Sequence, residues 1–227
     1  MDNEYENERL EEVERYGIMD TPWDETYDGY TKLAATLFDM PVSIISIVDK
    51  DRIWVKSGHG MEGGCQINRE PGLCDHTISG EVPYLVEDTV LNEITVNHSF
   101  AQGAMGIRFY AGIPLRTRNG YNLGSFCVMD KQPRKFSSSQ LLHLSALGKL
   151  LMDYIELVHL QKTILLQQKG IVKELAHDLK NPLTIITLQS ELLMEEKGVT
   201  EDIVEMSRQI SVAGRKINET INKHLFS

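Results

Sequence analysis

The feature that most constrains this chain is a heptad pattern of mainly apolar residues in its second half. The pattern advances in alternating steps of four and three residues, which is the spacing of a coiled-coil seam. Its members are Leu147, Leu151, Tyr154, Val158, Gln161, Leu165, Gln168, Val172, Leu175, Leu179, Pro182 and Ile186. A solitary helix has nothing to bury one apolar seam against, so the pattern predicts a helix over residues 138–196 that pairs with another helix.

A second helix is predicted after the first. Gly198 is expected to end the long helix, and Thr200 to cap the next one, with Glu201 and Asp202 in its first turn. Apolar residues then recur at steps of three and four, at Ile203, Met206, Ile210, Ala213, Ile217, Ile221 and Leu225. Two helices with one stripe each cannot close a core, whereas two copies of a hairpin over residues 172–225 form a four-helix bundle. The chain is therefore predicted to be a homodimer.

The first 137 residues have a different sequence pattern, in which short helical and strand segments alternate. Helices are predicted at residues 4–16, 26–39 and 73–79, and strands at residues 42–49, 52–58, 84–88, 107–117 and 121–130. The turn sequences DKD and RNG join consecutive strands, which indicates hairpins. This part of the chain is predicted to have an α+β fold, with a mainly antiparallel sheet of about five strands flanked by helices.

Charge and cysteine content narrow the expected partners and compartment. The formal net charge is −10, and residues 1–25 carry ten acidic side chains against two arginines. An acidic chain lacks the basic footprint of a nucleic-acid binder, so no such partner is expected. Cys65, Cys74 and Cys127 form no close pair and leave an odd count, which favours a cytoplasmic protein. No apolar run approaches the roughly 18 residues that a membrane span needs.

The segment ELAHDLKNPL, residues 174–183, carries the candidate chemistry. Leu175 and Leu179 occupy seam positions of the heptad, so His177, which lies between them, falls at an outward-facing position. Asp178 is its neighbour, and Asn181 lies one turn later on the helix. Pro182 has no N–H and leaves one backbone carbonyl without its helical partner, so the helix is expected to bend there.

The run His-Asp-Leu-Lys-Asn-Pro-Leu resembles the H-box of the histidine-kinase dimerisation and phosphoacceptor domain (HisKA), whose usual pattern is His-Glu/Asp-x-x-Asn/Thr-Pro-Leu. The resemblance covers residues 165–225. It implies that His177 accepts a phosphoryl group on a ring nitrogen, and that Asp178 holds the imidazole tautomer and accepts its proton. Asn181 would position water or an incoming aspartate. The phosphoryl group would be exchanged with an aspartate of a response-regulator receiver domain.

The chain contains no phosphate-binding motif of the form GxxxxGKS. No autonomous kinase activity is expected, and ATP would act only through an absent domain or a partner kinase domain. Two interpretations stay open: the front part of a sensor histidine kinase, and a stand-alone histidine phosphotransfer protein. A third is a non-catalytic protein that dimerises with a kinase and regulates it.

Residues 4–158 resemble a GAF sensory domain, chiefly in the stretches Ile45–Trp54, Cys74–His76, Ile107–Leu115 and Gly124–Asp130. The resemblance implies a ligand cleft on one face of an antiparallel sheet, but it does not identify the ligand. The candidate ligand-binding residues are Cys74, His76, Arg108 and Tyr110. A simple ligand-binding or photoreceptor module is a further alternative. The expected regions are a GAF core over 1–137, a signalling coiled-coil helix over 138–170 and a phosphoacceptor hairpin over 171–227.

Four side chains, those of His59, Cys65, Cys74 and His76, have the chemistry of metal ligands. Their spacing lacks the C-x2-C pair of recognisable zinc sites, so no metal is expected. No cofactor is assigned beyond an unknown small molecule in the GAF cleft.

Overall fold

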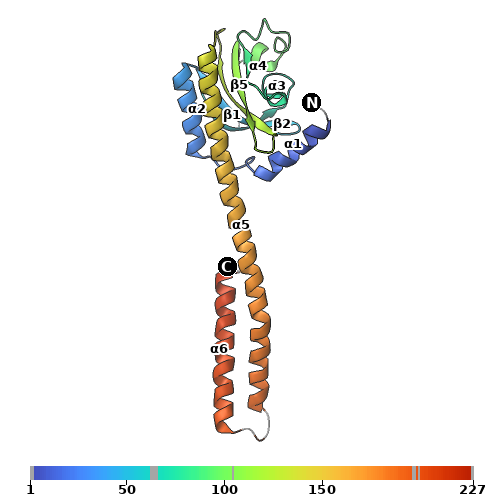
Figure 1. The fold of residues 1–227 in the computed structure, drawn as a ribbon, viewed down its shortest axis with the longest axis vertical. Helices are drawn as coiled ribbons and strands as arrows, with labels where there is room; N and C mark the ends of the chain where they lie inside the picture. The colour runs from blue at the N-terminus through green and yellow to red at the C-terminus, as the bar shows by residue number, and fades with distance from the viewer. Residues whose placement is uncertain (1–2, 62–65, 104, 196–197, 199, 226–227) are drawn as a thin grey trace. The chain divides into compact units, whose positions relative to one another are not determined.

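The computed structural model describes residues 3–61, 66–103, 105–195, 198 and 200–225. The chain divides into two compact units between His159 and Leu160 (Figure 1). Helix α5 (Ser138–Glu195) contributes residues to both units, and each unit is described by itself.

The first unit is built on a six-stranded sheet with the order β3-β2-β1-β6-β5-β4, in which every neighbouring pair is antiparallel. The strands are β1 (Val42–Val48), β2 (Arg52–His59), β3 (Gln66–Asn68), β4 (Tyr84–Val86), β5 (Phe109–Arg116) and β6 (Asn122–Asp130). The predicted α+β class and the two hairpins are confirmed. The sequence predicted about five strands and missed β3, because three residues are too few to show an alternating pattern.

Both faces of this sheet are covered, which explains why its central strands are buried at almost every position. Helices α1 (Asn3–Tyr16) and α2 (Glu25–Phe38) and the start of α5 cover one face, where Phe109, Phe126 and Val128 point. Helix α3 (Leu73–Ser79) covers the other face, where Tyr110, Cys127 and Met129 point. Successive side chains along a strand therefore point to opposite faces of the sheet and pack into two separate cores. The short helix α4 (Ser99–Gln102) was not predicted.

Helix α2 has clear start and stop signals. The side chain of Asp24 accepts a hydrogen bond from the backbone N–H of Thr26, 2.9 Å away, and so caps the first turn. Asp39 adopts a left-handed conformation, with φ +53°, and ends the helix two residues before Pro41. Leu33 and Leu37 are about half exposed. The buried face is formed by Tyr27, Thr31, Ala34, Ala35 and Phe38.

The beginning of helix α5 belongs to the core of the first unit. Leu144, Leu151, Met152 and Ile155 are buried against the sheet, and Leu147 and Tyr154 pack beside them. Leu147, Leu151 and Tyr154 were predicted to lie on a coiled-coil seam, but they pack into the core of the first unit, where Tyr154 contacts Tyr27 and Tyr30 of α2. A repeat of apolar residues shows that one helix face is covered, but not whether a sheet or a helix covers it.

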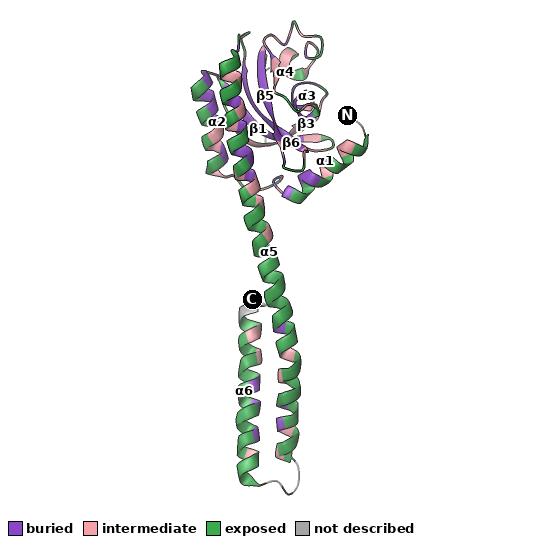
Figure 2. Ribbon diagram, viewed as in Figure 1, coloured by how far each residue is buried: buried purple, intermediate pink, exposed green. Residues whose placement is uncertain are grey.

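The second unit is a hairpin of the later part of α5 and helix α6 (Glu201–Leu225), as predicted. Among the described residues of this hairpin, those that are buried are small. They are Ala176, Thr187, Ser190, Ser207, Ser211 and Gly214. At one side of the interface, the carboxylate of Glu191 accepts hydrogen bonds from Ser211 and Arg215. Figure 2 shows that most of both helices remains exposed.

Candidate functional site

The phosphoacceptor candidate lies on the exposed surface of α5 in the second unit. The side chain of His177 is 73% exposed, and that of Asp178 is 70% exposed. Nδ1 of His177 lies 3.5 Å from Oδ1 of Asp178. This places the carboxylate beside one ring nitrogen, so the proton of a neutral imidazole is favoured on Nδ1 and the lone pair on Nε2. An exposed ring in this tautomer can act as a nucleophile through Nε2.

The turn after His177 supplies the other two predicted residues. Asn181 is exposed, and Pro182 lies inside α5, which stays helical on both sides of it. Since Pro182 has no N–H, the carbonyl of Asp178 has no donor from the residue four positions later. The hydroxyl of Thr184 donates to the carbonyl of Lys180, 2.8 Å away, within the same turn. The bend at Pro182 stays a prediction.

Large apolar side chains are exposed along both helices of the hairpin. On α5 they include Leu175, Leu179, Ile186 and Leu193. On α6 they include Ile203, Met206, Ile210 and Ile217, which are four of the seven residues of the predicted stripe. The intramolecular contact uses the small residues instead. The apolar stripes are therefore available to a further helical surface.

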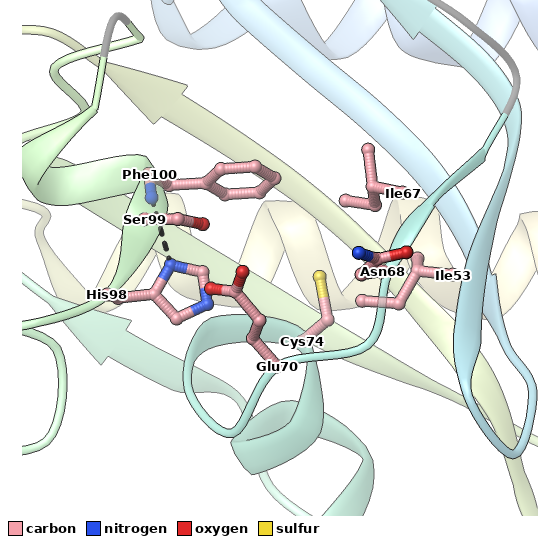
Figure 3. A pocket seen from close by; sticks show the side chains of 8 residues that line it. All are labelled: Ile53, Ile67, Asn68, Glu70, Cys74, His98, Ser99 and Phe100. Atoms are coloured by element: carbon pink, nitrogen blue, oxygen red, sulfur yellow. Dashed lines mark hydrogen bonds between the residues drawn. The ribbon is translucent and has the colours of Figure 1, made fainter.

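The first unit contains a cavity of about 280 Å³ on the side of the sheet that α3 covers. Its lining combines three apolar side chains with five polar ones: Ile53, Ile67, Phe100, Asn68, Glu70, Cys74, His98 and Ser99. Figure 3 shows these side chains around a common space, with the carboxylate of Glu70 beside the ring of His98. A concave site with a mixed lining of this kind is suited to a small molecule.

The predicted ligand residues are only partly gathered at this cavity. Cys74 lines it, and burial raises the pKa of its thiol, which is therefore uncharged at neutral pH. Tyr110 is fully buried, and its hydroxyl lies 2.8 Å from the hydroxyl of Thr77.

The other two candidates lie outside this cavity lining. Arg108 forms an ion pair with Asp88, with Nη2 2.6 Å from Oδ2. His76 is exposed and stacks on Tyr84, with 5.2 Å between ring centroids. A ligand role for His76, Arg108 and Tyr110 stays a prediction.

Sequence reasoning missed most of the cavity lining, including Glu70, His98 and Phe100. They come from a loop and from α4 and its cap, where no periodicity indicates which side chains converge. The Nδ1 atom of His98 accepts a hydrogen bond from the N–H of Phe100 at 3.1 Å. Its ring meets the ring of Phe100 edge to face, with 5.2 Å between centroids, and it packs against Gly72. A Cβ at Gly72 would lie 2.1 Å from Cδ2 of His98, so only glycine allows this approach.

Metal ligands do not cluster in the part of the chain that the structure describes, where no group of three or more His, Cys, Asp or Glu side chains could hold an ion. Cys65, one of the four side chains with metal-ligand chemistry, lies outside the described residues. Among the described helices, none is long and apolar enough to cross a bilayer.

Comparisons with known proteins match both parts of the chain. The family model "GAF domain" matches residues 22–155, and the model "His Kinase A (phospho-acceptor) domain" matches residues 167–226. No ATP-binding domain of the histidine-kinase type is found in the 227 residues. A cyclic di-GMP phosphodiesterase of Pseudomonas aeruginosa is 35% identical over 131 residues, which are 58% of this chain and 22% of that protein. The chain thus spans about a fifth of that relative's length.

Solved structures of low identity share the fold of the first unit. A GAF domain from a Coxiella burnetii phosphoenolpyruvate-protein phosphotransferase has a TM-score of 0.53 at 14% identity, over 70% of this chain and 95% of its own. A GAF domain from the same kind of Acinetobacter enzyme has a TM-score of 0.51 at 18% identity, over 72% and 99%. A domain of a putative two-component sensor histidine kinase from Sinorhizobium meliloti has a TM-score of 0.51 at 16% identity, over 61% and 94%. The chain therefore belongs to the GAF-domain family, and a His Kinase A phosphoacceptor domain follows its GAF domain.

Proposed function

We propose that this chain is a two-component signalling protein in which the GAF domain controls phosphoryl transfer through His177, to or from an aspartate of a response-regulator receiver. A GAF domain followed by a HisKA domain suggests two-component signalling. The observation that carries the proposal is the exposed imidazole of His177, with the carboxylate of Asp178 beside its Nδ1.

The chemistry assigned to this pair is nucleophilic attack at phosphorus. With Nδ1 protonated, the Nε2 lone pair of His177 attacks an acyl phosphate on the receiver, an N–P bond forms and the P–O bond to the receiver aspartate breaks. The aspartate leaves as a carboxylate with the bonding electron pair. The imidazolium that results is stabilised by the carboxylate of Asp178, which can accept the Nδ1 proton. In the opposite direction, the receiver carboxylate attacks phosphorus and the N–P bond breaks. Asn181, one turn away, is assigned to position the incoming group.

The proposal includes a homodimer, in which the exposed stripes of both hairpins form a four-helix bundle. A HisKA domain in general implies dimerisation and interaction with response regulators. The support on this chain is the exposure of Leu175 and Leu179 on α5 and of Ile210 and Ile217 on α6. Side chains of this size are seldom left in water along one continuous stripe. Helix α5 carries both core residues of the GAF unit and His177. One continuous helix therefore joins the proposed sensory domain to the proposed phosphoacceptor.

The test is transfer of a phosphoryl group from labelled receivers. A panel of purified receiver domains, each labelled at its aspartate with radioactive acetyl phosphate, is mixed with the full chain. We expect an acid-labile, base-stable label on the chain. His177→Gln should abolish it, and His143→Gln, which removes an exposed histidine of the same helix, should retain it.

The same experiment separates the proposal from its main alternative. A chain that dimerises but gains no label from any receiver of the panel would be a non-catalytic regulator. A label that survives His177→Gln would place the chemistry on another residue.

A further inference from the structure

We propose that the cavity of the GAF unit binds a small organic cation, an ammonium group on an apolar or aromatic body, with Glu70 as its charge partner. This inference rests on the sensory role proposed above for the GAF domain and names the class of its ligand. It does not depend on the chemistry of His177. The argument comes from the charge, the donors and the apolar surface of the cavity lining.

The charge of the lining is set by one carboxylate. Glu70 is half-buried and forms no ion pair with lysine or arginine within the described residues. Its neighbour Arg69 is engaged elsewhere, because its guanidinium binds Glu6 at 2.6 Å and Asp75 at 2.7 Å. The sequence has no lysine or arginine between Lys56 and Arg69. A half-buried carboxylate without a cation nearby attracts a positive ligand and repels an anion.

His98 does not cancel this charge. Burial lowers the pKa of His98 more than the nearby charge of Glu70 raises it, so its imidazole is neutral at pH 7. Its Nδ1 accepts the hydrogen bond from Phe100, so the proton of the neutral ring is on Nε2. Figure 3 shows this ring beside the Glu70 carboxylate. His98 is therefore a fixed neutral donor beside Glu70.

The rest of the lining fits an apolar body. Ile53, Ile67 and Phe100 contribute aliphatic and aromatic surface, and an aromatic ring face also attracts cations. The thiol of Cys74 is uncharged, since burial raises its pKa. Asn68 and Ser99 offer neutral hydrogen-bonding groups. A cavity of about 280 Å³ selects a ligand of modest size.

The test uses three probes of nearly equal size that differ in charge: benzylamine, benzyl alcohol and benzoate. The full chain is labelled with ¹³C at the isoleucine δ-methyl groups and titrated with each probe. We expect benzylamine to shift the methyl signals of Ile53 and Ile67, and to leave those of Ile113 and Ile155, in the other core, unchanged. The Kd for benzylamine should be about tenfold lower than for benzyl alcohol, and benzoate should bind weakest.

Two variants identify the charge partner. Glu70→Gln should raise the Kd for benzylamine to that for benzyl alcohol, while Glu93→Gln, an exposed carboxylate outside the cavity lining, should leave it unchanged. The methyl spectrum of each variant reports whether its core is intact. Benzoate binding as tightly as benzylamine, an unchanged preference in Glu70→Gln, or no shift of Ile53 and Ile67 at millimolar probe would each overturn the inference. Labelling of His177 in the same preparation shows whether the phosphotransfer proposal stands independently.

Discussion

Oγ1 of Thr187 occupies the space that a Cβ on Gly214 would need, because an ideal Cβ there would lie only 2.3 Å from it. The two helices of the hairpin therefore approach closely at this level, and the residues buried between them have small side chains. The larger apolar residues of both helices are left on other faces. Because small residues pack the hairpin, its large apolar residues remain available for the proposed homodimer contact.

Gly214→Ala should destabilise the hairpin. The added methyl group conflicts with Thr187, whose side chain is restricted to few rotamers in a helix, and we expect a net cost of about 1–2 kcal/mol despite the higher helix propensity of alanine. Urea unfolding followed by circular dichroism at 222 nm measures this cost. Both tryptophans, Trp23 and Trp54, belong to the first unit, so their fluorescence should not change.

Two further variants make the Gly214 experiment specific. Thr187→Ala in the Gly214→Ala background removes the obstructing oxygen and should recover most of the loss. Gly170→Ala has no atom within 4 Å of the new Cβ, and it should stabilise α5 by about 0.5–1 kcal/mol. Equal effects of Gly170→Ala and Gly214→Ala would contradict close packing at Thr187.

Ile210→Lys should dissociate the proposed dimer. Ile210 belongs to the exposed apolar stripe of α6, and a lysine there would bury its charge in the bundle. Light scattering after size exclusion should give the mass of a dimer for the unchanged chain and of a monomer for Ile210→Lys. Val212→Lys places the same charge at an exposed position outside the stripe, and this variant should keep the mass of a dimer. A monomeric unchanged chain would contradict the bundle directly.

Asp178→Asn should slow phosphoryl transfer through His177 by about 100-fold, the usual effect of losing a group that manages a proton in the transition state. The amide can no longer stabilise an imidazolium by charge. Because Asp178 is 70% exposed, its replacement should change the free energy of unfolding by no more than about 0.5 kcal/mol. Single-turnover transfer from a labelled receiver measures the rate. Asp202→Asn, at the start of α6, removes one exposed carboxylate from the same hairpin and should leave the rate unchanged.

The sequence predicted most of the fold because its elements carry strong local signals. The boundaries of α3 and the β1–β2 hairpin follow from short patterns with clear turns. The prediction failed for the first part of α5, because the sequence of a helix does not show which surface packs against its apolar face. The heptad pattern of α5 looks uniform, yet Leu151 is buried in the core of the first unit, whereas Leu175 is exposed in the hairpin. Periodicity identifies a covered face and not its partner.

The two candidate sites differ in how far sequence could predict them. His177, Asp178 and Asn181 lie within one turn of one helix, so helix geometry alone brings them together. The cavity around Glu70 is assembled from β2, β3, α3 and α4, over residues 53 to 100. No local pattern encodes that convergence. Of the four predicted ligand residues, Cys74 is the one that lines this cavity.

The buried ion pair of α1 should make the GAF unit sensitive to acid. Arg9 is fully buried, and it donates to Glu6 at 2.8 Å and to the carbonyl of Val48 at 2.7 Å. Burial would raise the pKa of Glu6, but hydrogen bonds from Arg9 and Arg69 outweigh it and lower the pKa from 4.5 to about 2. In the unfolded chain Glu6 titrates near 4.5, so its stabilisation is complete above pH 4.5 and is lost as the pH falls toward 2.

Glu6→Gln tests this pair by leaving the charge of Arg9 buried without its carboxylate. We expect a loss of about 3 kcal/mol at pH 7, and a shallower fall in stability between pH 4.5 and 2 than in the unchanged chain. Urea unfolding followed by tryptophan fluorescence at a series of pH values measures both. Glu11→Gln, an exposed carboxylate of the same helix, controls for the loss of one negative charge. Identical pH dependence in Glu6→Gln and the unchanged chain would show that Glu6 titrates alike in the folded and unfolded states, and that Arg9 is not what holds its pKa low.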